Sequence, residues 1–322
     1  MSGWGRFRRR RLALIALVLL GAFALVALCA DLIASDLPIA VRVEGHTYVL
    51  PARTRPPALA HEDMASLRAR AEWLIPPLFE RGPDQPHLDA VLHPPGADAP
   101  LGTDELGRDV LARLVHGARL SLVIGLLSVG LYVLIGVVLG ALAGWFGGVV
   151  DTIVSRVTEV MLAFPTFFLV LAILGVMRVE SIVPVMVVIG LTRWTDVSRL
   201  VRGEVLRLKT EDYVQASRAL GAPPMWVIAR HLLPNALGPV LVNATFGIAG
   251  AILIETALSF LGFGVPPPQA SWGELLTQAH RYVTWPGAWW LTLFPGMAIF
   301  FTVTALNLVG EGLRDAFDPR LR

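Results

Sequence analysis

Glu255 is the clearest charged residue inside a long apolar stretch, where it stands in Ile-Leu-Ile-Glu-Thr-Ala-Leu. An ionised carboxylate is costly in hydrocarbon, so this side chain is expected to face a partner, a cavity or a subunit interface. Two interpretations stay open. The carboxyl group either lines a pathway or gate through a membrane, or makes a buried hydrogen bond between two helices.

Residues 203–210 (Gly-Glu-Val-Leu-Arg-Leu-Lys-Thr) come close to the glycine-rich loop that cradles phosphate. Leu208, however, takes the position of the second glycine, where backbone amides must approach the phosphate, and no strand precedes the segment. We also find neither a zinc-protease helix nor a serine-nucleophile elbow. The chain is therefore expected to bind no cofactor and to catalyse no reaction, so any ATP hydrolysis must come from another polypeptide.

The histidines and the single cysteine predict no metal site. His46, His61, His87 and His93 lack ligand spacing and are expected to be scattered surface residues. Cys29 lies in an apolar run, where packing is its expected role.

The longest polar interruption in the second half of the chain is Glu211–Asn235, EDYVQASRALGAPPMWVIARHLLPN. It predicts two short amphipathic helices separated by a Gly-Ala-Pro-Pro break. Gly221 suits a left-handed C-terminal cap, and Pro224 can open the second helix because a first-turn residue needs no amide hydrogen. The second helix is expected to end before Pro234. It is expected to bury Met225, Trp226, Ile228 and Leu232.

Composition predicts an all-α polytopic membrane protein. The chain has 322 residues, of which 55% are hydrophobic and 16% charged. In a typical soluble domain about a quarter of the residues are charged. About six transmembrane helices are expected. They lie near residues 12–33, 120–143, 157–176, 182–195, 237–258 and 289–309.

Arginine placement predicts the orientation. Arg6 and Arg8–Arg11 precede the first span, and the arginine-rich loop 199–231 falls on the same side when six spans are counted, so both termini are expected in the cytoplasm. The expected parts are the cytoplasmic N-terminus with the first span (1–34), an extracytoplasmic insertion with a hairpin over 40–49 (35–100), an amphipathic interfacial helix (101–119), a permease core (120–310) with a cytoplasmic loop (204–235), and a cytoplasmic tail (311–322).

The polar interruption resembles the EAA loop of the membrane subunits of ABC importers: Glu-Ala-Ala, three residues, Gly, nine residues, then Ile-x-Leu-Pro. Gln215-Ala216-Ser217, Gly221 and Leu233-Pro234 keep this spacing. Gln215, Ser217 and His231 depart from the family's usual residues. The resemblance implies that ATPase subunits dock on this loop.

From Leu101 onward the chain resembles the C-type membrane subunit of the dipeptide/oligopeptide ABC importer family, which has the type I ABC importer permease fold. Residues 32–48 also resemble the branch that includes the Yej permease for peptides and microcin C. The motifs that carry the family resemblance are Leu101-Gly-Thr-Asp with Gly107-Arg-Asp109, Ala143-Gly-Trp-Phe-Gly-Gly148 with Asp151, Leu258-Ser-Phe-Leu-Gly-Phe-Gly264, Ser271-Trp-Gly273 and Gly312-Leu-Arg-Asp315.

The resemblance implies a bacterial inner-membrane, binding-protein-dependent importer of peptides. The expected partners are a second, B-type membrane subunit, two ATP-binding subunits that hold ATP and magnesium, an extracytoplasmic substrate-binding protein and the lipid bilayer, with no nucleic acid. The docking residues that it implies are Tyr213, Gln215, Ala216, Ser217, Ala219, Gly221, Ala222, His231, Leu233 and Pro234.

Alternatives remain open at this point. The same subunit type could serve nickel or a peptide antibiotic, because nothing in the spans identifies a ligand. An ion-coupled secondary carrier would need more buried ionisable residues than Glu255 alone, and an intramembrane enzyme would need a catalytic dyad that the chain lacks.

Overall fold

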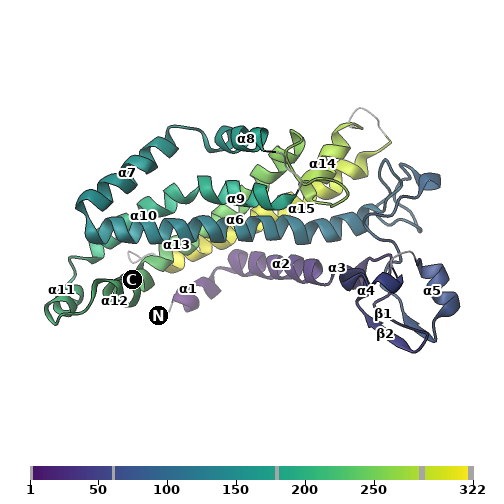
Figure 1. The fold of residues 1–322 in the computed structure, drawn as a ribbon, viewed down its shortest axis with the longest axis horizontal. Coiled ribbons are helices and arrows are strands. Elements are labelled where there is room, and N and C mark those ends of the chain that lie inside the picture. Colours follow the sequence, from purple (N-terminus) through teal and green to yellow (C-terminus); the bar gives the residue numbers. More distant parts are fainter. Residues whose placement is uncertain (1–2, 60–61, 178–180, 283–286, 318–322) are drawn as a thin grey trace. The chain divides into compact units, whose positions relative to one another are not determined.

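The computed structural model describes residues 3–59, 62–177, 181–282 and 287–317, and the chain divides into two compact units. Unit 1 comprises Met1–Leu19, Ile124–Ile254 and Val303–Arg322, and unit 2 comprises Leu20–Val123 and Glu255–Thr302. Long helices run through both units, namely α2 (Arg11–Leu28), α6 (Val110–Phe146), α13 (Leu233–Phe260) and α15 (Trp289–Phe317) (Figure 1).

Within the described residues, these are the four helices long and apolar enough to cross a membrane. A fifth span is formed if α7 (Gly148–Leu162) and α8 (Thr166–Val176), bent by 84° at a short break, count as one. The span expected over 182–195 is instead α9 (Ile182–Thr192), with 11 residues, whereas about 20 are needed to cross the hydrocarbon core. The multi-span helical architecture is confirmed, and the predicted count of six is not.

Glycines let α6 pack closely on α10 (Trp194–Leu208) in unit 1. A Cβ atom at Gly136 would lie 2.7 Å from the carbonyl oxygen of Trp194, and one at Gly140 would lie 2.4 Å from that of Ser198. One at Gly144 would lie 2.9 Å from the Cβ of Val205. Spaced four residues apart, these glycines form one face along which the two backbones approach. Unit 1 also contains α7, α8 and α9, together with α1 (Gly3–Arg9), α11 (Asp212–Ala219) and α12 (Pro224–Val227).

Unit 2 contains a three-stranded antiparallel sheet in the order β2-β1-β3, made of β1 (Ala40–Val43), β2 (His46–Val49) and β3 (Trp73–Ile75). The predicted hairpin is confirmed. Its turn residues Glu44 and Gly45 have φ angles of 53° and 79°, the left-handed pair typical of tight hairpins. One face of the sheet packs on a small core that includes Val41, Leu59 and Leu67. Short helices complete the unit, namely α3 (Ala30–Ile33), α4 (Pro51–Thr54), α5 (Met64–Arg70) and α14 (Trp272–His280).

The separate helix expected over 101–119 does not form. Residues 101–109 form turns closed by an isolated antiparallel β-bridge between Thr103 and Asp109, and α6 begins at Val110 and continues without a break to Phe146. Gly102 and Gly107 have φ angles of 77° and 72°, which keep the preceding segment out of the helical conformation. The carboxylate of Asp109 caps the helix by accepting the backbone N–H of Ala112 at 2.9 Å.

Candidate functional site

The polar interruption forms a helical elbow in unit 1, made of α11, a turn at Gly221 and α12 (Figure 1). Gly221 has a φ of 81°, which confirms the predicted left-handed cap. Pro224 opens α12 in its first turn, also as predicted. Each residue type is thus explained by local backbone chemistry: glycine permits the left-handed turn, and proline is tolerated where no amide hydrogen is needed.

The expected end of the second helix before Pro234 is wrong. After α12 the chain forms a π-helix over Ile228–Leu232 and passes directly into α13. The N–H of Leu233 donates to the carbonyl of Ile228, five residues back. Pro234 then lies inside this continuous run, where it donates no amide hydrogen to the carbonyls of the preceding turn. The second limb of the elbow is therefore continuous with a membrane-spanning helix.

Apolar side chains on the elbow divide into a buried set and an exposed set. Val227, Ile228 and Leu232 are buried, whereas Met225 and Trp226, which were expected inside, are 61% and 48% exposed. A short helix can bury only one face. In α12 the buried face is the one that continues into the π-helix. Leu220, next to the turn, is 89% exposed and was missed from the sequence. Three large apolar groups thus lie on the surface of the elbow, as a docking surface requires.

The predicted docking residues all lie on the elbow or at its junction with α13. Tyr213 and His231 are brought together, with ring centroids 5.8 Å apart, and Trp226 packs on the same imidazole at 5.0 Å. Gln215 has a structural contact, since its side-chain amide donates to the carbonyl of Lys209 at 2.7 Å. The exposed members are Tyr213, Gln215, Ala216, Ala219, Gly221 and Pro234, and the half-buried ones are Ser217, Ala222, His231 and Leu233.

Glu255 is fully buried in unit 2, near the end of α13. Its Oε1 accepts hydrogen bonds from the hydroxyls of Ser259 and Ser271, both at 2.8 Å. The first turn of α14 lies close by: a Cβ atom at Gly273 would be 2.7 Å from the Cα of Thr256. These contacts favour the interpretation of Glu255 as a buried link between α13 and α14.

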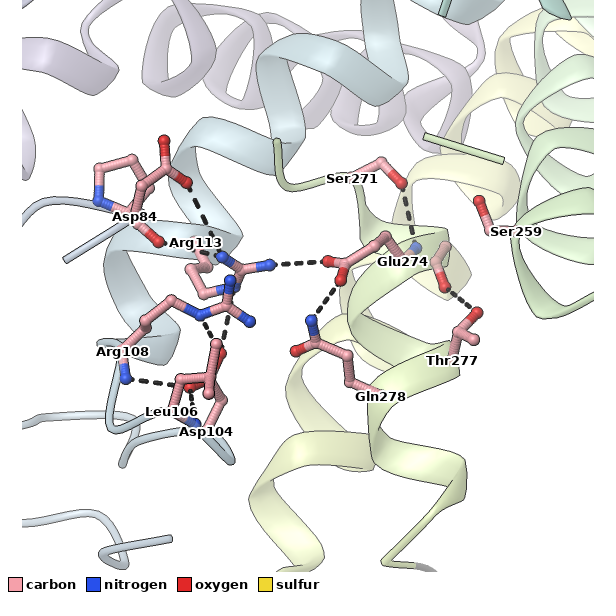
Figure 2. A network of polar contacts seen from close by, with 12 residues as sticks. Asp84, Asp104, Leu106, Arg108, Arg113, Ser259, Ser271, Glu274, Thr277 and Gln278 are labelled. Atoms are coloured by element: carbon pink, nitrogen blue, oxygen red, sulfur yellow. Dashed lines mark hydrogen bonds and ion pairs between the residues drawn. The ribbon is translucent and has the colours of Figure 1, made fainter. Parts of the chain in front are cut away.

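Ser271 connects Glu255 to a larger polar network in unit 2, drawn in Figure 2. The Ser271 hydroxyl caps α14 by accepting the N–H of Glu274 at 3.0 Å. Glu274 in turn accepts from Arg113 at 2.7 Å, and Gln278 donates to the same carboxylate. Arg113 is completely buried and also lies 3.5 Å from Asp104, which holds Arg108 at 2.7 Å.

Charge is nearly balanced in this network, which explains how it is tolerated inside the protein. Burial raises the pKa of the Glu274 carboxyl, and the guanidinium of Arg113 opposes the shift by favouring the charged form. Arg113 also donates to the carbonyl of Pro83 at 3.0 Å. The network therefore ties the segment before α6 to α6 and α14.

Two functional alternatives can be compared with this geometry. Residues 203–208 of the near phosphate loop belong to α10, so their backbone amides are engaged in a helix and cannot cradle phosphate. Among the described residues, no group of three His, Cys, Asp or Glu side chains could hold a metal ion.

Comparison with known proteins identifies the family. Residues 136–322 match the family described as binding-protein-dependent transport system inner membrane component, and residues 2–51 match the N-terminal transmembrane domain of oligopeptide transport permease C. The chain belongs to this family of inner membrane components. It is a permease subunit of an ABC importer and not an enzyme.

Curated relatives of the permease extend over most of its length. The di/tripeptide transport system permease protein DppC of Pseudomonas aeruginosa is 40% identical over 258 residues, which cover 78% of this chain and 83% of the relative. The dipeptide transport system permease protein DppC of Bacillus subtilis is 42% identical over 229 residues, or 71% of each chain.

A solved structure shows the same fold. One chain of the MetNI methionine ABC transporter, in an inward-facing conformation, matches the permease with a TM-score of 0.50 and 21% identity, covering 65% of this chain and 97% of that one. The type I ABC importer permease fold expected from the sequence is thereby confirmed.

Proposed function

We propose that this permease is the C-type membrane subunit of a bacterial peptide importer. It would pair with a second membrane subunit to enclose the path, receive substrate from an extracytoplasmic binding protein, and dock two ATPase subunits through its own elbow and that of its partner. The names of the relatives support peptides as the substrate class. Nickel and peptide antibiotics are the alternative substrates that the substrate test must distinguish from peptides.

The elbow is the observation that carries the proposal. Leu220, Met225 and Trp226 are exposed on the elbow, and its second limb, α12, is continuous with α13 through the π-helix. A partner covering these groups gains about 25 cal/mol for each Å² of apolar surface buried. ATP must favour one arrangement of the spans over another, and a docked element continuous with a span can transmit that difference. Docking on ATPase subunits requires the elbow to lie in the cytoplasm, and the proposal includes both termini on that side.

The Gly221→Leu variant tests docking. Leucine is strained at a φ of 81°, so we expect loss of ATP-dependent peptide uptake with normal membrane insertion. Gly203→Leu is the matched control, because Gly203 lies on α10 with open space around its Cα and an ordinary φ. Uptake that survives in Gly221→Leu would count against the docking role.

Cross-linking gives the second measurement. Cys29 is the only native cysteine, so a Cys29→Ser background allows a single new thiol at Leu220. We expect Leu220→Cys to cross-link to an ATPase subunit in membranes and a thiol at the exposed Leu88 of unit 2 to give no such product. The extracytoplasmic binding protein that delivers to the permease, titrated with peptides and with nickel, would identify the substrate.

A further inference from the structure

Trp145 lies at the point where the elbow is attached to the rest of unit 1. It is the penultimate residue of α6 and its side chain is 7% exposed. The guanidinium of Arg218, on α11, lies 5.3 Å from the centre of the indole ring, and the ammonium of Lys209 lies 5.6 Å from it. Both distances are within the range at which a cation is attracted to the ring face.

Backbone carbonyls reinforce the same attachment. The last carbonyls of a helix have no partner within the helix and attract cations and donors. The ammonium of Lys209 donates to the carbonyl of Trp145 at the end of α6. Gln215 of α11 donates to the carbonyl of Lys209, just after α10, at 2.7 Å. Hence α11 is held to the ends of both α6 and α10.

The two helices to which α11 is attached pack closely on each other, so we expect them to move together. Gly140 and Gly144 bring α6 close to the backbone of α10, with only the short β-branched side chains of Val201 and Val205 at the contact. The other limb of the elbow is continuous with α13 through the π-helix. The two limbs therefore lead to different spans.

We propose that Trp145 is a positioning residue for energy coupling: it fixes α11 to α6 and α10, so that displacement of the elbow moves these helices. The proposal rests on the docking function above. It assigns Arg218 a role inside the permease through Trp145, and not as a contact to the ATPase.

A double-mutant cycle in the complete, purified importer in lipid vesicles tests this role. The variants are Trp145→Leu, Arg218→Gln and the double variant, and the readouts are peptide transported per ATP hydrolysed and ATPase subunit co-purified. We expect each single variant to lower the transport ratio by about threefold to tenfold, the size of a cation–π contact. The double variant should be no worse than Trp145→Leu alone, because that variant already removes the contact of Arg218 together with that of Lys209. Co-purified ATPase should be unchanged.

Controls separate a ring effect from general damage. Trp145→Phe keeps an aromatic face and should retain at least about half of the ratio. Phe146→Leu alters the adjacent, exposed aromatic residue, and Arg230→Gln removes one charge from the other limb; both should match the wild type. Should Trp145→Leu fail to accumulate, Trp145→Met, a flexible side chain without an aromatic ring, takes its place in the cycle.

Additive losses in the cycle, or an unchanged ratio in Arg218→Gln, would overturn the proposal. Loss of co-purified ATPase in Arg218→Gln alone would also overturn it, by assigning Arg218 to the docking surface, and would leave the docking function standing. Failure of the wild-type permease to co-purify any ATPase would refute the docking function itself.

Discussion

At the scale of single residues, the buried carboxyl of Glu255 shows how a span tolerates a polar group. One oxygen accepts from two serine hydroxyls, and the other, Oε2, has no hydrogen-bond partner among the described residues. The site needs an acceptor for the two hydroxyls, because unpaired buried polar groups are costly, and it does not need a full charge. A neutral acceptor would serve equally well.

Substitution at this position distinguishes a structural acceptor from an ionised gate. Glu255→Gln keeps an amide oxygen for Ser259 and Ser271 and should leave transport and thermal stability near the wild type. Glu255→Leu leaves both hydroxyls without an acceptor and should lower the free energy of unfolding by about 1–3 kcal/mol. Thermal unfolding and peptide uptake of the purified importer measure both effects. Normal stability with abolished uptake in Glu255→Gln would instead support an ionised pathway role.

At the scale of elements, the glycine face of α6 determines how closely it approaches α10. Gly140→Leu would place its Cβ 2.4 Å from the Ser198 carbonyl oxygen, so the helices must separate. Overpacking of this kind costs about 1–3 kcal/mol and occasionally more. We expect a lower yield and a lower Tm.

Gly130→Leu provides the matched control on the same helix, since Gly130 has nothing within 4 Å and is exposed. It should fold like the wild type. Equal losses in the two variants would mean that any leucine in α6 is harmful and that the close approach at Gly140 is unimportant.

Element prediction succeeded where local chemistry decides the backbone. The hairpin over 40–49, with its turn at Glu44 and Gly45, and the Gly221 cap depend on residues that accept a left-handed φ, and both the hairpin and the cap were predicted. The burial of Met225 and Trp226 was predicted wrongly because periodicity shows that a helix has an apolar face but not whether this chain or another covers it. The passage through Pro234 was missed because a π-turn depends on how α13 packs, which spacing does not reveal.

Longer-range features were beyond the sequence. Ser271 is distant in the chain from its partner Glu255, and Arg113 is distant from its partner Glu274. No periodicity or motif relates these positions, so the sequence indicated the charged residues but not the network that they form. Trp145 was noted only as part of a family motif. Its neighbours Lys209 and Arg218 lie more than sixty residues further along the chain, and helix packing alone brings them together.

At the scale of the whole molecule, each unit carries a different task. Unit 1 holds the elbow with its attachments, whereas unit 2 holds the network that joins the segment before α6 to α6 and α14. Arg113 is the centre of that network (Figure 2). It has no exposed surface, so its loss cannot be compensated by solvent.

Arg113→Leu should therefore destabilise unit 2 strongly. Removing one partner of a buried pair leaves Glu274 uncompensated and costs about 3–5 kcal/mol. Adding Glu274→Gln should recover part of this loss. Arg119 lies on the same helix as Arg113 and forms a more exposed pair with Asp31. Arg119→Gln should therefore cost less. Thermal unfolding ranks the variants, and a milder effect of Arg113→Leu than of Arg119→Gln would contradict the assigned role.

The position of Lys209 has a practical consequence. It is the chain's single lysine and lies between α10 and the elbow, so a lysine-specific endoprotease can nick the polypeptide at one peptide bond only. That nick would sever one limb and leave the other continuous with its span. The rate at which the two fragments appear then reports, without any label, how far a partner covers the elbow as nucleotide is added and removed.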